Sequence, residues 1–305
     1  MKLAFLFLLA GICAVAAATD TAKSLASARI VMLGTGTPNA DPDHSGPATA
    51  IVVGDQAYLV DFGPGVVRRA AAAQKKYGLV ALKASHLDIA FVTHLHSDHT
   101  AGYPDLILTP WVLERAKPLR VYGPPGIKAM TQHILQAYAE DIDMRLHGGE
   151  PSNATGYKVE AHEIAPGEVY RDANVRVTAF AVKHGGWKHA YAYRFDTPGR
   201  SVVISGDTAP TNAIVEACRG CDVLIHEVIS TSTLSGRPPE WQRYHAAFHT
   251  QTKDLARIAN AAKPKLLVLY HQLYGTGGTD ADLLRELREA GYAGEVVSAQ
   301  DLDMF

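Results

Sequence analysis

The sequence predicts an α/β protein built as a four-layer αββα sandwich, in which two sheets pack between outer helices. Predicted strands alternate with predicted helices along both halves of the chain, and no linker, low-complexity run or short-period repeat interrupts them. Of the 305 residues, 47% are hydrophobic, which is enough to bury a large core. We therefore expect a single domain to span residues 19–305.

The first 18 residues are typical of a signal peptide. Lys2 supplies a positive start, residues 3–15 form a short apolar run, and Ala16-Ala17-Ala18 offers a small-residue cleavage site. The apolar run is shorter than an ordinary membrane span, so we expect no span after cleavage. These features predict an exported protein, periplasmic or secreted, whose mature chain begins near Thr19.

The first half of the mature chain opens with a strand at 29–33 and a glycine-rich turn at 34–38. Two apolar runs on either side of Gly54-Asp55 predict a hairpin, and Gly63-Pro64-Gly65 precedes a helix. Further along, we expect Pro110 to bend or break the helix that contains it. The predicted strands are 48–53, 57–61, 89–93 and 119–122, and the predicted helices are 66–76, 104–115 and a segment through 130–139.

The second half repeats this alternation. We predict strands at 175–182, 190–196, 201–205, 223–226, 266–270 and 295–298, and helices at 211–218, 250–262 and 280–290. Cleavage of the signal would leave Cys218 and Cys221 as the cysteines of the mature chain. In an oxidising compartment this pair can close a small disulfide loop, but the sequence alone leaves its state open.

Three histidines and one aspartate crowd into residues 94–99, directly after the apolar run 89–92. Such side chains are seldom buried without a partner, because an unpaired polar group in an apolar setting costs several kcal/mol. His94 and His96 alternate at the end of a strand, while Asp98 and His99 begin a helix and approach from another direction. The string therefore predicts two neighbouring metal sub-sites.

Further candidate ligands follow later strands. His184 comes after the strand at 175–182, Asp207 after 201–205, and His271 after 266–270. Taken singly, His184 or His271 is more often a structural histidine than a metal ligand. Together with the first cluster, they favour a metal site.

These motifs resemble those of the metallo-β-lactamase superfamily, and the resemblance runs from about residue 29 to residue 271. It is closest to the ribonuclease Z and secreted arylsulfatase-like members. The matching segments are Leu33-Gly34-Thr35-Gly36-Thr37-Pro38, the string at 93–99, Ser205-Gly206-Asp207-Thr208, Ile225-His226-Glu227, His249-Thr250-Gln251-Thr252 and Leu269-Tyr270-His271.

The resemblance implies two zinc ions and a αββα fold of the metallo-β-lactamase type. One zinc would be bound by His94, His96 and His184, the other by Asp98, His99 and His271, with Asp207 bridging them. Two zinc ions about 3.5–4 Å apart share a hydroxide that attacks the substrate. A glutamate in place of His96 would have suggested the di-iron relatives, so His96 favours zinc and hydrolysis.

The resemblance also implies catalytic roles for Asp98, His249 and Glu227. His249 lies 22 residues before His271 and would donate a proton to the leaving group, while Glu227 orients and polarises it. The alternative is structural: His249 caps the helix that follows it, and Glu227 makes a buried ion pair.

We expect an exported zinc hydrolase that cleaves small sulfate or phosphate (di)esters with aryl leaving groups. His184 and Asp207 are 23 positions apart, too close for the long arm with which bacterial ribonuclease Z grips tRNA, and export would separate the enzyme from tRNA. The formal net charge of −2 predicts no basic surface for nucleic acid. A small-molecule ester is therefore the expected partner and nucleic acid is disfavoured; the resemblance further implies a homodimer.

Three other functions stay open at the level of sequence. They are β-lactam or lactone hydrolysis on the same metals, a ribonuclease Z-type phosphodiesterase, and a non-catalytic metal-binding protein on an inherited hydrolase fold.

Overall fold

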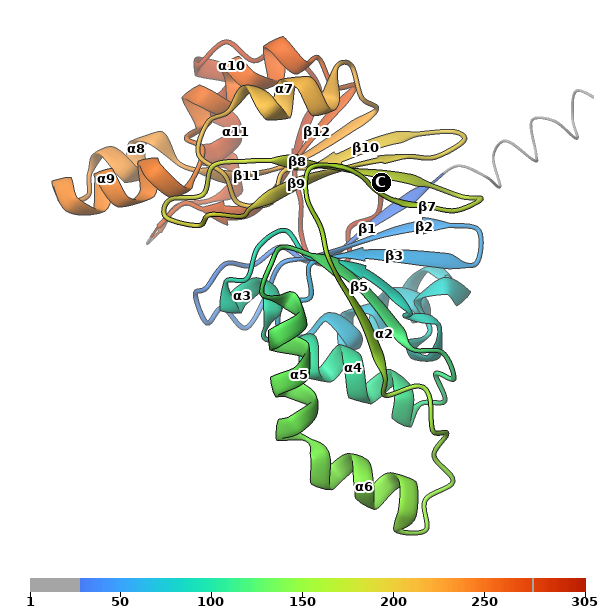
Figure 1. The fold of residues 1–305 in the computed structure, drawn as a ribbon. Helices are drawn as coiled ribbons and strands as arrows, with labels where there is room; N and C mark the ends of the chain where they lie inside the picture. The colour runs from blue at the N-terminus through green and yellow to red at the C-terminus, as the bar shows by residue number, and fades with distance from the viewer. Residues whose placement is uncertain (1–27, 276) are drawn as a thin grey trace, which may run out of the picture.

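Two β-sheets lie face to face between two layers of helices, which confirms the predicted αββα sandwich (Figure 1). The structure is a computed structural model that describes residues 28–275 and 277–305. The predicted signal peptide at residues 1–18 lies outside the described residues. None of the helices within them is long and apolar enough to cross a membrane.

The first sheet has six strands in the order β1-β2-β3-β4-β5-β6. Its first three strands are antiparallel, and the pairs from β3 onward are parallel. The strands are β1 (Arg29–Gly34), β2 (Ala48–Val53), β3 (Gln56–Val60), β4 (Ile89–Phe91), β5 (Leu119–Gly123) and β6 (Val159–Glu163). Its outer face is covered by α2 (Val66–Tyr77), α4 (Tyr103–Val112) and α5 (Ile127–Ala137), with two 3₁₀ turns at Val80–Leu82 and Ala84–His86; α6 (Ala139–His147) continues from α5 away from the sheet.

The second sheet has seven strands in the order β13-β12-β11-β10-β9-β8-β7. Strands β7 to β10 are antiparallel, and β10 to β13 are parallel. The strands are β7 (Gly167–Arg171), β8 (Arg176–Ala181), β9 (Tyr191–Asp196), β10 (Ser201–Ile204), β11 (Val223–Ile229), β12 (Leu266–Leu273) and β13 (Val296–Ser298). Its outer face is covered by α7 (Asn212–Cys218), α10 (Thr252–Ala262) and α11 (Asp280–Glu289).

The core between the sheets is organised around the fully buried Phe91 at the end of β4. Its ring stacks on Tyr122 at 5.2 Å and meets the edges of Tyr193 at 5.6 Å and Phe195 at 5.4 Å. Such offset and edge contacts add to the stabilisation from burial alone. The strand that leads into the histidine-rich string is therefore held from both sheets.

The structure adds elements that the sequence did not predict. Strands β6 and β7 have the polar sequences VEAHE and GEVYR, and they carry the chain from the first sheet to the second. Two short helices, α8 (Thr231–Ser235) and α9 (Pro239–Phe248), precede α10. Pro110 lies inside α4 and does not end it. Cys218 and Cys221 are joined by a disulfide bond.

A buried arginine ties α4 to the loops around it. Arg115 is 1% exposed, and within the described residues it has no carboxylate within ion-pair distance. Its guanidinium donates instead to backbone carbonyls: Leu87 and Leu106 at 2.9 Å, Ile107 at 2.7 Å and Gly156 at 2.8 Å. Burial lowers the pKa of Arg115 to about 10, so the side chain stays charged at neutral pH.

We predict that Arg115→Met lowers the free energy of unfolding by at least about 2 kcal/mol, because it removes the buried guanidinium donor from four backbone carbonyl groups. Arg115→Lys should lose less, since an ammonium group keeps the charge and some of the bonds. Urea denaturation measures both effects. Arg285→Met is the matched control: Arg285 is about half exposed and pairs with Asp282 and Glu289 at the surface, so its loss should stay within about 0.5 kcal/mol. Equal midpoints for the two Met variants would contradict the prediction.

Candidate metal centre

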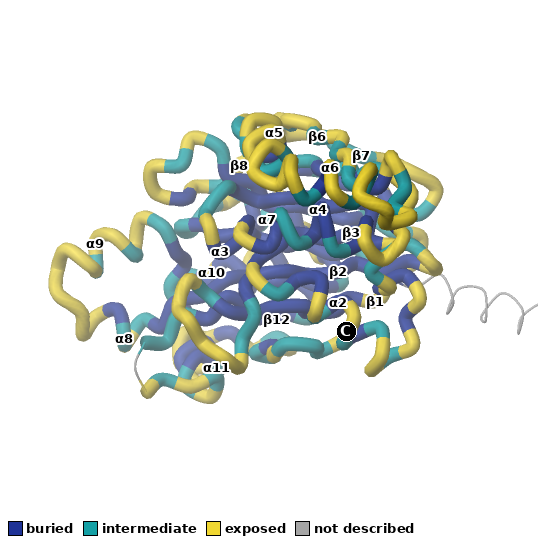
Figure 2. Tube along the Cα trace, turned by 90° about the horizontal axis from the view of Figure 1, so that it is seen from below, coloured by how far each residue is buried: buried dark blue, intermediate teal, exposed yellow. Residues whose placement is uncertain are grey.

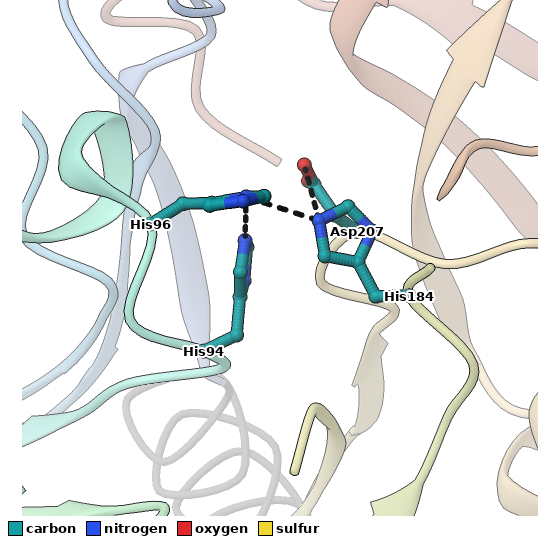
Figure 3. Close-up of side chains that lie close together, drawn as sticks. All are labelled: His94, His96, His184 and Asp207. Atoms are coloured by element: carbon teal, nitrogen blue, oxygen red, sulfur yellow. Dashed lines mark hydrogen bonds and ion pairs between the residues drawn. The ribbon is translucent and has the colours of Figure 1, made fainter. Parts of the chain in front are cut away.

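Three histidine rings bring their nitrogen atoms to one point between the two sheets (Figure 3). His94 Nε2 lies 2.9 Å from His96 Nδ1, and His184 Nε2 lies 3.1 Å from the same atom. A carboxylate oxygen of Asp207 completes this group, whose four ligand atoms lie within 4.8 Å of one another. His94, His184 and Asp207 are buried, and His96 is partly exposed. Such convergence of unlike donors is typical of a metal site.

A second group lies on the other side of Asp207. His271 Nε2 is 3.2 Å from Asp98 Oδ2, and His99 Nε2 is 3.5 Å from the same oxygen. Asp207 reaches both groups, because its Oδ1 lies 3.3 Å from His99 Nε2 and its Oδ2 lies 3.9 Å from His184 Nε2. The structure thus brings all seven predicted ligand residues together, with Asp207 placed between the two sets.

The backbone at the ends of β3 and β4 positions the first string. The short helix α3 (Ser97–Thr100) begins directly after His96, which turns Asp98 and His99 toward the second group. The Phe62 amide donates to the His99 carbonyl at 3.0 Å. A Cβ atom at Gly63 would lie 2.5 Å from the Asp98 carbonyl oxygen, so only glycine allows this approach.

An irregularity in the second sheet positions His271. In the pairing of β11 with β12, Glu227 faces Tyr270 and Val228 faces Gln272, so His271 is an extra residue in β12. It has a φ of 47°, and its amide donates to the Thr35 carbonyl at 2.9 Å. Bulges of this kind redirect a side chain that the regular strand would point elsewhere.

The outer nitrogen atoms of three histidines meet partners that orient the rings. His99 Nδ1 lies 2.9 Å from Asp61 Oδ2, His94 Nδ1 lies 3.0 Å from Thr93 Oγ1, and His184 Nδ1 donates to the Phe248 carbonyl at 2.9 Å. A partner on one ring nitrogen leaves the other free for a metal. Asp61 was not among the predicted site residues, although it follows a buried strand just as the predicted ligands do.

The charges in this pocket require compensation. Burial lowers the pKa of His99, but the carboxylates of Asp207 and Asp61 outweigh it and raise that pKa well above its usual value. Burial likewise favours the protonated form of Asp207, yet His271 and His99 hold the pKa of this carboxyl well below its ordinary range. His99 Nε2 and Asp207 Oδ1 are buried without a hydrogen-bond partner among the described residues. A divalent cation bound between them would satisfy both atoms, so the donor set fits a metal.

A buried ion pair adjoins the two groups. His249 Nδ1 lies 3.3 Å from Glu227 Oε2, and the other oxygen of Glu227 accepts from the Thr250 amide at 2.8 Å. Burial lowers the pKa of His249, but the Glu227 carboxylate more than reverses this and raises it. A ring nitrogen of His249 lies within 4.8 Å of donor atoms of Asp207 and His271. His249 does not cap α10, whose N-cap residue is Gln251.

A family model described as the beta-lactamase superfamily domain matches residues 56–272. The chain belongs to the metallo-β-lactamase superfamily. It is also 32% identical over 276 residues to ribonuclease Z of Mycobacterium bovis, a match that covers 90% of this chain and 96% of the relative. Ribonuclease Z of Mycobacterium marinum matches with the same identity and coverage.

Solved structures of this superfamily share the fold. The metallo-beta-lactamase fold protein YhfI from Bacillus subtilis aligns with a TM-score of 0.70 at 19% identity, covering 91% of this chain and 98% of that one. Human short-form tRNase Z aligns with a TM-score of 0.67 at 21% identity and the same coverage. The chain has the superfamily's fold and this set of donors, and it is a metal-dependent hydrolase that binds a divalent metal.

The relatives correct one expectation from the sequence. We disfavoured nucleic acid as a partner, and this is contradicted by relatives that are named ribonuclease Z. The short segment between His184 and Asp207 does not distinguish this chain from the ribonuclease Z relatives, because the match covers 96% of their length. The net charge does not exclude nucleic acid as a partner either, because it sums over the whole chain and does not show where cations lie.

We predict that Asp61→Asn weakens binding of Zn²⁺ by about 10- to 100-fold, because the neutral amide no longer supplies the negative charge that stabilises the His99 ring as a ligand. Asparagine suits the position, since Asp61 has a φ of 61° and asparagine tolerates this conformation. Competition with a chromophoric chelator gives the affinity. Asp143→Asn, at a side chain 76% exposed on α6, is the control and should bind Zn²⁺ like the parent chain. Unchanged affinity in Asp61→Asn would show that this contact does not support the metal.

Proposed function

We propose that this chain is a ribonuclease Z-type phosphodiesterase that hydrolyses RNA. The observation that carries the proposal is its 32% identity to ribonuclease Z across nearly the full length of both proteins. The convergence of seven metal-binding side chains beside an ion-paired histidine supports it. The relatives favour this reaction over hydrolysis of aryl sulfates, which was the first expectation from the sequence.

We assign the metal ligands from the two groups of donors. His94, His96 and His184 would bind one Zn²⁺, and Asp98, His99 and His271 a second, with Asp207 shared. When bound, such ions lower the pKa of water and offset the negative charge that a phosphodiester develops during hydrolysis. Imidazole and carboxylate donors suit zinc.

We assign proton donation to His249. Hydrolysis of RNA expels a ribose oxygen, which is strongly basic and needs a proton as its bond to phosphorus breaks. Glu227 raises the pKa of His249, which favours the protonated ring that this step needs. Glu227 is itself fully buried and held by the Thr250 amide, so it fixes the ring in place. The proton donor and its carboxylate therefore act as one unit at the edge of the metal centre.

The test of the proposed function is hydrolysis of an RNA oligonucleotide that carries a stem and an unpaired 3′ tail, by the zinc-loaded protein. Bis(p-nitrophenyl) phosphate and p-nitrophenyl sulfate serve as comparison substrates. We expect zinc-dependent cleavage of the RNA and of the small diester. Turnover of the sulfate ester without cleavage of RNA would overturn the proposal.

We predict that His249→Ala slows cleavage of RNA by about 10²- to 10⁴-fold. It should slow hydrolysis of bis(p-nitrophenyl) phosphate by less than about tenfold, because p-nitrophenolate leaves without a proton. Single-turnover rates on both substrates measure the difference. His133→Ala, at an exposed histidine of α5, is the matched control.

Two results would contradict this role for His249. Equal losses on the two substrates would show that the ring does not protonate the leaving oxygen. Loss of bound zinc from His249→Ala, measured by elemental analysis, would make His249 a metal ligand instead.

A further inference from the structure

Helix α9 carries a row of aromatic rings along one face, which we call the aromatic stripe: Trp241, Tyr244, His245 and Phe248. Their spacing of three, four and seven residues places them on the same side of a helix. Trp241 lies 5.8 Å from both Tyr244 and His245, and Tyr244 stacks on Phe248 at 4.5 Å. The stripe is thus continuous along the helix.

The aromatic stripe does not belong to the hydrophobic core. No residue of α9 is buried, and Trp241 and Tyr244 are 48% and 44% exposed. Helices α8 and α9 project from the body of the protein beside the second sheet, and most of α9 is exposed (Figures 1 and 2). Adjacent exposed aromatic groups are typical of a surface that binds a ligand or another macromolecule.

The inner end of the aromatic stripe meets the candidate metal centre. The Phe248 ring lies 4.9 Å from the His184 ring, and its carbonyl accepts from His184 Nδ1. His249, the assigned proton donor, is the next residue along the chain. A molecule bound at the metal centre could therefore extend outward along α9 without leaving the protein surface.

Several cations lie close to the aromatic stripe in the sequence or beside the turn against which it packs. Residues 231–248 contain Arg237 and Arg243 but only one acidic residue, Glu240. Lys183 and Lys188 flank the turn that contains His184, against which Phe248 packs. None of these four cations forms an ion pair with another residue in the described part of the chain. They are available to a polyanion.

We propose that the aromatic stripe stacks unpaired nucleotides of the RNA that adjoin the scissile phosphate. The inference rests on the proposed function. Aromatic side chains next to cations are the usual means of holding single-stranded nucleic acid, because every base offers a face for stacking and every linkage a phosphate. The continuity of the stripe with the metal centre favours a substrate strand over a second protein. Arg237, which lines a pocket together with His245 of the stripe, supplies positive charge for the phosphates along this strand.

The experiment compares kcat/KM for the tailed RNA with kcat/KM for bis(p-nitrophenyl) phosphate, which is too small to span α9. In the double variant Trp241→Ala, Tyr244→Ala, the ratio of the two values should fall at least about tenfold, through a higher KM for RNA. Trp241→Phe, Tyr244→Phe keeps two rings and should restore most of the ratio. Met144→Ala, at a side chain 63% exposed on α6, is the control and should leave the ratio unchanged.

The outcomes separate this inference from the proposed function. If the parent chain hydrolyses the small diester but not RNA, the proposed function fails. If RNA is cleaved and the alanine double variant keeps the parent ratio, the aromatic stripe does not bind RNA and this inference fails alone. An unchanged ratio with loss of a dimer, measured by light scattering, would assign the stripe to contact with a second copy. Thermal unfolding of each variant confirms that it is folded.

Discussion

The site depends on charge balance in a pocket from which water is largely excluded. Asp61, Asp98, Asp207 and Glu227 are all buried, and each lies within 3.3 Å of an imidazole. A buried carboxylate is tolerated only where positive charge or donors face it. His99 and His249 face these carboxylates and have raised pKa values for that reason, and divalent cations would supply the same positive charge. The same electrostatic requirement therefore explains both the folded pocket and its affinity for metal.

The pocket forms where strands of the two sheets end next to each other. His94 follows β4 of the first sheet, while Asp207 follows β10 and His271 lies in β12 of the second. The aromatic core around Phe91 fixes the sheets relative to each other just beneath these ends. Residues that are far apart in the sequence thus share one pocket, and no single loop has to hold it.

Most strands and the seven candidate ligands could be predicted, for a shared physical reason. Each ligand follows an apolar run, and a polar group in that position stands out against the hydrophobic pattern, as His184 and Asp207 do. Strands β6 and β7 lack such a pattern because they are partly exposed, so nothing in their sequences separates them from loops. Asp61 was missed because its role depends on the ring of His99, which only the folded chain brings to it. The prediction that nucleic acid is not a partner was wrong. It relied in part on net charge, which averages over the chain and does not show where on the surface the cations lie.

The extra residue in β12 has a consequence for how such a site persists in evolution. Deleting His271 would let β12 pair with β11 in continuous register and would remove the positive φ at this position. The sheet would become more regular and the pocket would lose a donor from its second group. The local preference of the backbone thus opposes the chemistry, and surrounding contacts such as the bond from the His271 amide to the Thr35 carbonyl hold the bulge against it. A copy of this fold that no longer needs the donor would lose no function by closing the bulge, which makes strand register at β12 a marker of whether the chemistry is retained.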